Sequence, residues 1–224
     1  MVRLTGERLL RETVISEEEF RDMISKTYEH PPTYPQYYGL RDRALLSILR
    51  LTGKRVSELS RLKVGDLKVE GDYLSITFTI RKKRKKSIIL LRREKLIPLT
   101  DPLTQYILEY LEWIRENQPD QVWLFPRTFF SPRFNTLTFG DTPLTTRQIL
   151  RIVQKYNPTV WCHLFRETVA SDIIRRDPTI LSAWKVKLRL NLESISSGFR
   201  YLDRFARDVI RREIPHTDTK EVIV

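Results

Sequence analysis

Two short segments combine residue types that suit the binding of a phosphate. Arg55 follows Thr52-Gly53-Lys54 and precedes Val56-Ser57-Glu58-Leu59, and further along the chain His163 and Arg166 lie three residues apart. A guanidinium is planar, always charged and able to bind two oxygens at once, so a pair of arginines suits a phosphate that gains negative charge in a transition state. His163 and Arg166 share one face of a predicted helix, so a single phosphate can contact both. Either pattern alone is more often an ordinary surface feature.

Tyr201 is the candidate nucleophile among 9 tyrosines. It follows the segment Leu190–Arg200 on a predicted helix. A tyrosine oxygen that attacks phosphorus leaves a phosphotyrosine, which conserves the energy of the broken bond for rejoining. We expect neither a cofactor nor a metal ion, because the sequence lacks a clear carboxylate or Cys/His cluster. Cys162 is the only cysteine, which excludes a disulfide within the chain.

In their order and spacing, these segments resemble the catalytic boxes of the tyrosine recombinase family, the phage integrases and Xer-type enzymes. The segment around Arg55 resembles the box of the first catalytic arginine, and His163-Leu164-Phe165-Arg166 resembles the HxxR box. Leu190–Tyr201 resembles the box that ends in the nucleophile, and the whole resemblance runs from about Ile15 to Arg212. An archaeon or an archaeal mobile element is one source that we expect for such a chain.

The resemblance implies a metal-independent, site-specific DNA recombinase or integrase that cleaves and rejoins double-stranded DNA through a 3′-phosphotyrosine on Tyr201. Arg55, Arg166 and His163 would stabilise the transition state, and His163 could also transfer a proton. The nearest alternatives share this chemistry and are a type IB topoisomerase and a telomere-resolving enzyme. The alternative from another class is a catalytically impaired DNA-binding or architectural protein.

The family also uses a lysine in the turn of its small sheet, as general acid for the leaving 5′ oxygen. The predicted turn here is the basic run Arg81–Lys86, in which Lys82, Lys83 and Lys85 are all candidates. Lysines of a solvated turn also bind DNA phosphates without taking part in chemistry. The sequence does not choose among the three lysines.

Leu192 departs from the family pattern, which usually has His or Trp nine residues before the tyrosine. A leucine cannot donate a hydrogen bond to the scissile phosphate, and losing such a donor costs roughly ten- to a thousandfold in rate. Trp184 or Asn191 could replace it only if the helix register shifts. Leu192 is therefore the feature that favours the impaired DNA-binding alternative.

The length and charge suit one DNA-binding domain. The chain has 224 residues, with 40 Lys+Arg against 28 Asp+Glu and a net charge of +12, and this excess favours a polyanionic partner. We expect residues 1–14 to be an N-terminal extension, 15–214 the catalytic domain and 215–224 a C-terminal tail. The family's N-terminal core-binding domain is expected to be absent.

The sequence also indicates where in the cell the protein is expected. No apolar run is long enough to cross a membrane and the N-terminus lacks the apolar core of a signal peptide. We therefore expect a cytoplasmic, nucleoid-associated protein with no membrane partner. The abundance of Lys, Arg and Glu leans toward a thermophile.

The hydrophobic patterning predicts an α+β, mostly helical catalytic domain with a small three-stranded antiparallel sheet. Helices are expected from a capping box at Ser16 and over Leu40–Thr52, Arg55–Leu62, Pro102–Arg115, Thr146–Tyr156, Trp161–Arg176, Pro178–Leu190 and Ser194–Glu213. Strands are expected at Tyr73–Ile80, Ser87–Leu91 and Glu94–Leu99, with an irregular stretch over Gln118–Leu144.

An apolar stripe follows Tyr201 at helical spacing, among several arginines, and consists of Leu202, Phe205, Val209 and Ile214. In the family, the segment after the tyrosine docks on a neighbouring protomer. We therefore expect self-association into a dimer or tetramer on DNA, through this C-terminal helix. Packing of the stripe on its own domain is an equal alternative.

Overall fold

The computed structural model describes residues 14–29, 35–84 and 87–213, and for residues 82–84, 87, 88 and 208–213 it describes the backbone only. The described helices are α2 (Glu17–Lys26), α3 (Gln36–Thr52), α4 (Val56–Leu59), α5 (Pro102–Asn117), α6 (Thr146–Tyr156), α7 (Cys162–Arg176), α8 (Ile180–Leu190) and α9 (Ile195–Glu213). The strands are β1 (Leu67–Glu70), β2 (Tyr73–Arg84), β3 (Ser87–Pro98), β4 (Pro126–Ser131) and β5 (Thr136–Pro143). The expected mostly helical fold with a three-stranded antiparallel sheet is confirmed.

The helix ends show local signals that act as predicted. Ser16 accepts a hydrogen bond from the Glu19 amide at 3.0 Å, and the Glu19 carboxylate accepts one from the Ser16 amide, which completes the capping box of α2. Gly53 ends α3 in the left-handed region, at φ 59°, where a side chain would be strained. Arg55 lies just before α4 as its N-cap, so the short helix expected over Arg55–Leu62 is only four residues long.

The sheet has three strands, but they are not the three that we predicted. β1, over Leu67–Glu70, was missed, and it pairs antiparallel with β2. Ser87–Leu91 and Glu94–Leu99 are parts of one continuous strand, β3, which pairs with β2 from Tyr73↔Pro98 to Arg84↔Ser87. The charged residues in the middle of β3 break the apolar alternation without breaking the hydrogen-bond ladder, so the pattern divided one strand into two.

The stretch expected to be irregular, Gln118–Leu144, contains a second hairpin, β4–β5. Phe139 on β5 lies edge-on to Tyr37 with the ring centroids 5.0 Å apart, and it also packs near Trp113. These contacts come from α3 and α5. The hairpin thus depends on distant aromatic residues that no local pattern reveals.

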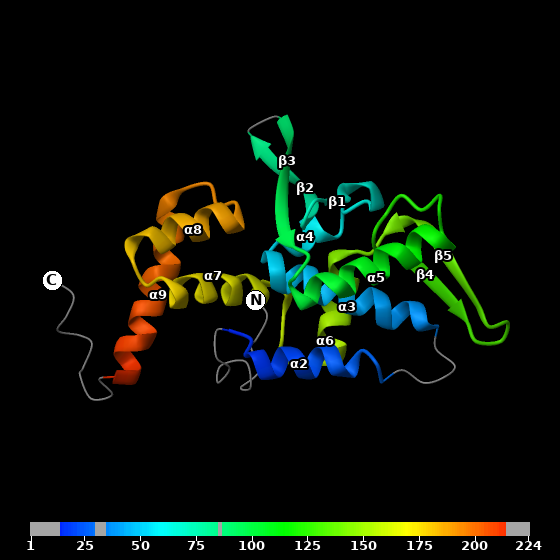
Figure 1. The fold of residues 1–224 in the computed structure, drawn as a ribbon, viewed down its shortest axis with the longest axis horizontal. Coiled ribbons are helices and arrows are strands. Elements are labelled where there is room, and N and C mark those ends of the chain that lie inside the picture. The colour runs from blue at the N-terminus through cyan, green and yellow to red at the C-terminus, as the bar shows by residue number, and fades with distance from the viewer. Residues whose placement is uncertain (1–13, 30–34, 85–86, 214–224) are drawn as a thin grey trace.

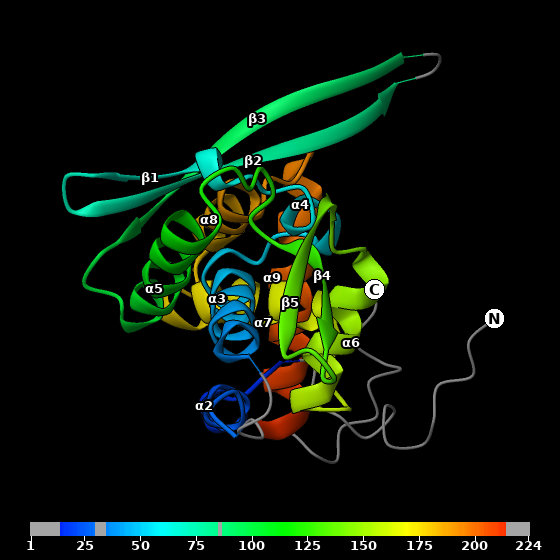
Figure 2. The same ribbon diagram turned by 90° about the vertical axis from the view of Figure 1, so that its right-hand side faces the viewer.

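Helix α3 runs through the middle of the molecule, with the three-stranded sheet on one side and α2 on the other (Figures 1 and 2). Its buried residues join the main hydrophobic core with α5, α6 and the sheet. A second cluster lies between α7, α8 and α9 and is centred on Val169, Val186 and Leu190. Helices α8 and α9 approach closely at Gly198, where any side chain would overlap the Ala183 carbonyl.

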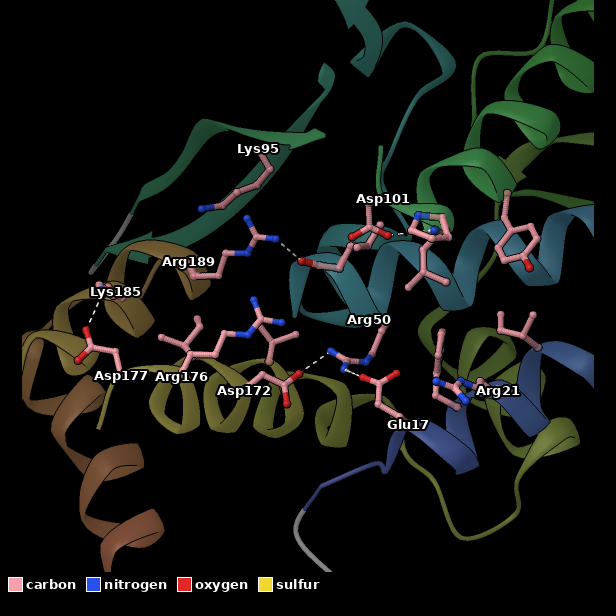
Figure 3. A pocket seen from close by; sticks show the side chains of 18 of the residues that line it. Glu17, Arg21, Arg50, Lys95, Asp101, Asp172, Arg176, Asp177, Lys185 and Arg189 are labelled. Atoms are coloured by element: carbon pink, nitrogen blue, oxygen red, sulfur yellow. Dashed lines mark hydrogen bonds and ion pairs between the residues drawn. The ribbon is translucent and has the colours of Figure 1, made fainter. Parts of the chain in front are cut away.

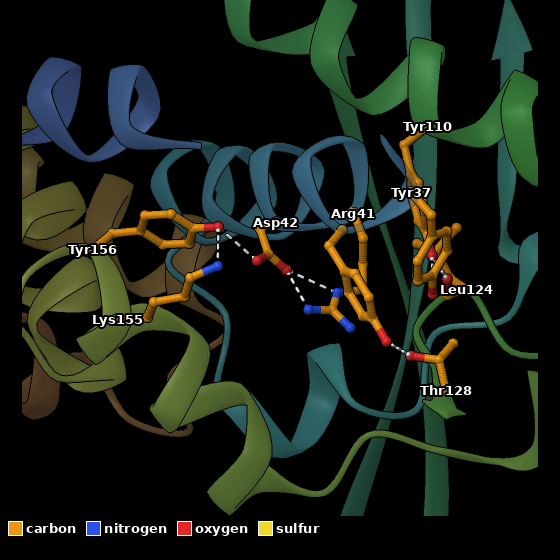
Figure 4. A network of polar contacts seen from close by, with 9 residues as sticks. Tyr37, Arg41, Asp42, Tyr110, Leu124, Thr128, Lys155 and Tyr156 are labelled. Atoms are coloured by element: carbon orange, nitrogen blue, oxygen red, sulfur yellow. Dashed lines mark hydrogen bonds and ion pairs between the residues drawn. The ribbon is translucent and has the colours of Figure 1, made fainter. Parts of the chain in front are cut away.

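A buried polar network crosses the core between α3, α5 and α6 (Figure 4). Arg41 forms an ion pair with Asp42 at 2.6 Å, and the Asp42 carboxylate accepts a hydrogen bond from Tyr156 at 2.7 Å. Tyr37 and Tyr110 share a hydrogen bond, and Tyr110 donates to the Leu124 carbonyl. Buried polar groups need partners, and this network satisfies them, so we read it as structural.

Candidate active site

Arg166 is the buried centre of the site, with a relative exposure of 2%. It lies on α7, and its guanidinium donates to the Gly53 carbonyl at 2.9 Å and to the Leu190 carbonyl at 2.7 Å. One side chain therefore joins the turn before Arg55 to the end of α8, where the box of the candidate nucleophile begins. The HxxR box, through Arg166, therefore holds the box of Arg55 and the box of Tyr201 together.

Tyr201 lies on α9, half-buried against the second cluster. Burial raises the pKa of its phenol and Glu167 raises it further, whereas the charge of Arg166 and a side-chain hydrogen bond with Arg166 lower it. The phenol is therefore protonated at neutral pH and lies against the guanidinium. Attack on phosphorus would require the phenol to lose this proton.

Arg55 presents its side chain to solvent beside Arg166. The Arg55 side chain is 55% exposed, and Nη1 lies 3.4 Å from Oε1 of the buried Glu58. Burial lowers the pKa of Arg166, and the charge of Arg55 lowers it further, which indicates that the two guanidiniums are close. Two neighbouring cations with one accessible to solvent form a site that favours an incoming anion.

His163 lies in the first turn of α7, one turn before Glu167. Its side chain is 59% exposed, and its Nε2 lies 3.1 Å from Oε1 of Glu167. The structure thus brings together Arg55, Arg166 and Tyr201. His163 lies one turn before Arg166, at the accessible start of α7.

Two of the candidate lysines, Lys82 and Lys83, lie near the far end of the described β2–β3 hairpin, which extends past the helices (Figure 2). Lys85 lies outside the described residues, and the backbones of Lys82 and Lys83 pair with Ile89 and Ile88. The strands continue as far as Arg84 and from Ser87, so the basic run is mostly strand rather than the open turn that we expected.

A family comparison agrees with this arrangement. The sequence model described as the Phage integrase family matches residues 14–203, which include all four residues discussed above. The chain belongs to the phage integrase family.

Two relatives illustrate the range of similarity. The tyrosine recombinase XerC of Chlamydia caviae is 32% identical over 146 residues, covering 62% of this chain and 40% of the relative. The XerC of Pelotomaculum thermopropionicum is 36% identical over 209 residues, covering 88% of this chain and 61% of the relative. This integrase-family chain therefore spans about half the length of such relatives.

Solved recombinase structures share the fold. The crystal structure of XerA recombinase superposes with a TM-score of 0.57 at 19% identity, covering 96% of this chain and 70% of that one. The post-cleavage complex of XerH recombinase with a palindromic difH substrate gives a TM-score of 0.59 at 18% identity, covering 89% of this chain and 52% of that one.

One residue of this integrase-family site was missed from the sequence. Lys54, directly before Arg55, is only 1% exposed, and its ammonium lies 5.1 Å from the centre of the Phe78 ring. With the Asn191 amide oriented so that both its atoms are satisfied, its oxygen accepts from Lys54 and its nitrogen donates to the Leu188 carbonyl at 3.1 Å. Burial lowers the pKa of Lys54 to about 7. The one sequence feature that could have pointed to Lys54 is its position between Gly53 and Arg55.

The two possible substitutes for Leu192, Trp184 and Asn191, each have other contacts in the structure. Leu192 itself is half-buried and packs against the second cluster. Asn191 ends α8 with φ 52°, and its amide is already bound to Leu188 and Lys54. Trp184 lies on α8 with 47% of its surface exposed and with Lys187 against its ring.

A groove of about 1340 Å³ opens between α2, α3, α5, α7 and α8 (Figure 3). It contains both acidic and basic groups, and Arg50 there is bound to Glu17 and Asp172. Neither Arg166 nor Tyr201 lines it. The groove is therefore separate from the site, and its cations Arg50 and Lys185 are paired with carboxylates of its own lining.

Among the residues that the structure describes, no group of three or more His, Cys, Asp or Glu side chains is placed to hold a metal ion. In the same part of the chain, no helix is both long and apolar enough to cross a membrane.

Proposed function

We propose that this chain is the catalytic domain of a site-specific DNA recombinase, with Tyr201 as the nucleophile on double-stranded DNA. The observation that carries the proposal is the anchoring of Arg166 to the carbonyls of Gly53 and Leu190, which holds its guanidinium beside the accessible Arg55 and near the phenol of Tyr201. A phosphate bound between the arginines would lie next to the phenol. Membership of the phage integrase family supports the same chemistry.

In the first step, the phenol oxygen of Tyr201 attacks phosphorus and the bond from phosphorus to the 5′ oxygen breaks. The phenol proton passes to His163 or to water, and a lysine of the β2–β3 hairpin protonates the leaving 5′ oxygen. Arg55 and Arg166 bind the equatorial oxygens, where negative charge accumulates. The product is a 3′-phosphotyrosine and a free 5′ hydroxyl.

In the second step, a 5′ hydroxyl from another strand attacks the phosphotyrosine and releases the phenol of Tyr201. The number of phosphodiester bonds is the same before and after, so no external energy source is needed. The same two arginines serve both steps because both pass through a similar phosphorane.

The strand register favours Lys82 over Lys83 as the general acid. Leu74, Ile76, Phe78 and Ile80 alternate along β2 as buried residues, and position 82 continues this series. The ring of Phe78 lies against the ammonium of Lys54, so this face of β2 is the one that meets the turn before Arg55. Position 83 belongs to the opposite face.

Covalent trapping on nicked suicide DNA, followed by denaturing electrophoresis, tests the proposal. An adduct that requires Tyr201 supports it, and the absence of any adduct overturns it. Leu192 favours a second candidate, an architectural DNA-binding protein, which would bind DNA without forming the adduct. A type IB topoisomerase would relax supercoils without exchanging strands between two sites, and a telomere resolvase would produce hairpin ends.

We also propose assembly into a dimer or tetramer on DNA and a cytoplasmic, nucleoid-associated location. The net charge of +12 supports a DNA partner. An archaeal or thermophilic source stays a prediction. A thermal unfolding midpoint well above the roughly 45–65 °C of mesophilic domains would support thermophily.

A further inference from the structure

The carboxylate of Glu167 joins the helix of the HxxR box to the helix that carries Tyr201. Its Oε1 lies 3.1 Å from Nε2 of His163, one turn earlier on α7. Its Oε2 lies 2.7 Å from Nη1 of Arg204 on α9. Arg204 lies one turn after Tyr201 and has no other role in the proposed chemistry. Each oxygen thus contacts a group from a different helix, His163 on α7 and Arg204 on α9.

Phosphate binding does not explain why the carboxylate of Glu167 lies beside His163 and Arg204. A negative charge beside a phosphate site opposes DNA binding, because like charges repel. The Glu167 side chain is only 13% exposed, whereas those of His163 and Arg204 are 59% and 55% exposed. A solvated surface pair contributes little, but a mostly covered carboxylate with a cationic or N–H partner on each oxygen fixes geometry.

Glu167 also acts on the nucleophile itself. After burial, its charge is the largest cause that raises the pKa of Tyr201, and Arg166 opposes it. The carboxylate is therefore close to the phenol as well as to His163 and Arg204. Removing the charge at position 167 should be visible in the titration of Tyr201.

We propose that Glu167 is a positioning residue that docks α9 on α7, holding Arg204 with one oxygen and His163 with the other so that Tyr201 lies against Arg166. The proposal rests on the proposed function for its catalytic consequence but not for the docking itself. The two helices also pack through apolar residues of the second cluster, which include Leu202 and Phe205. Apolar contacts are not directional, so the ion pair sets the orientation of α9.

The docking is tested without DNA, by amide hydrogen exchange of α9 in the full chain. The variants are Glu167→Gln, Arg204→Met and the double variant. The matched control is Arg207→Met, which removes the Asp203–Arg207 ion pair (3.1 Å) within the same helix. We expect faster exchange in both single variants, no further increase in the double variant and no change in the control between residues 198 and 205. Equal exchange in all proteins would overturn the proposal.

The catalytic consequence is measured by single-turnover cleavage of suicide DNA. Each single variant should slow cleavage by about ten- to a hundredfold, because a small misplacement of the nucleophile is costly. The double variant should be no slower than the slower single variant, while DNA affinity stays near that of the wild type. Losses that multiply in the double variant would overturn the proposal, because the two residues would then act independently.

A second readout separates positioning from a merely structural role. In Glu167→Gln, the phenolate absorbance assigned to Tyr201, taken as the difference from a matched Tyr201→Phe protein, should appear at lower pH than in the wild type. An unchanged titration would overturn the close placement of the carboxylate. If the wild type forms no DNA adduct but exchange still couples Glu167 to Arg204, the proposed function fails and the docking stands.

Discussion

The guanidinium of Arg166 donates to the carbonyl of Gly53 at 2.9 Å, across 113 positions of the sequence. The bond fixes the turn that presents Arg55, so a residue expected to bind phosphate also shapes its own site. The two arginines therefore differ in kind: Arg166 is buried and anchored, and Arg55 is accessible.

Tyr201→Phe should abolish the covalent DNA adduct and leave DNA affinity within about twofold. The substitution removes only the hydroxyl, and the ring can still pack against the second cluster. Denaturing electrophoresis on suicide DNA and equilibrium binding measure the two effects. Tyr156→Phe is the matched control, because Tyr156 is buried and donates to Asp42. An adduct in Tyr201→Phe would place the nucleophile elsewhere.

Arg55→Ala and Arg166→Ala should both slow cleavage by roughly a hundred- to a thousandfold. Their effects on stability should differ. Arg55 is mostly exposed but lies beside the buried carboxylate of Glu58, so its loss should lower the free energy of unfolding by about 1 kcal/mol. Arg166→Ala leaves the carbonyls of Gly53 and Leu190 without this donor, at a cost of about 1–3 kcal/mol each. Urea unfolding at fixed salt checks this, and equal stability losses would contradict the anchoring role.

Lys82→Ala should be rescued by a 5′-bridging phosphorothiolate, and Lys83→Ala and Lys85→Ala should not. A sulfur leaving group needs no general acid, so rescue identifies the residue that protonates the 5′ oxygen. The measurement is the cleavage rate on normal and sulfur-containing substrates. Rescue of Lys83→Ala would refute the assignment from strand register, and mild unrescued defects in all three would assign the run to DNA binding alone.

Lys54→Met should flatten the pH dependence of stability above neutral pH. Burial lowers the pKa of Lys54 from 10.5 to about 7, so between these values the unfolded chain binds more protons than the folded one. The free energy of unfolding should therefore rise from pH 7 toward pH 10, and the penalty for the buried charge is present in full below pH 7. Urea unfolding at pH 7 and pH 9 measures this rise.

The control for that measurement is Lys68→Met, because Lys68 lies exposed on β1. Lys95, whose pKa burial lowers to about 8, adds to the rise in every protein compared and so does not affect the difference. An equal rise in Lys54→Met and in the wild type would show that Lys54 titrates normally.

A chain that ends at Glu213 should stay folded and fail to assemble on DNA. Leu202 and Phe205, the first half of the apolar stripe expected to contact a neighbour, pack against their own domain. The side chain of Val209 and all of Ile214 lie outside the described residues. Sedimentation with and without paired sites should show a monomer in free solution and a dimer or tetramer on DNA for the full chain only. Assembly by the shortened chain would place the contact elsewhere.

The sequence determined the features that local chemistry controls. The helix predicted at about Thr146–Tyr156 is α6, which Thr145 caps and which has a strong apolar face. The helix expected over Leu40–Thr52 does end at Thr52, because Gly53 follows it in a left-handed conformation that few other residues adopt. The sequence also identifies Arg55, the HxxR box and Tyr201 as candidate site residues, because their types and their spacing along the chain are enough to recognise the pattern.

Only the tertiary structure decided which of these residues meet. The sequence shows Lys54 as one more basic residue, and burial against Phe78 is what lowers its pKa. The β4–β5 hairpin forms because Phe139 packs on Tyr37, a contact between residues that are far apart in the chain. Glu167 links α7 to α9 only because folding brings Arg204 to it. Such contacts depend on how elements pack, and packing has no local signature in the chain.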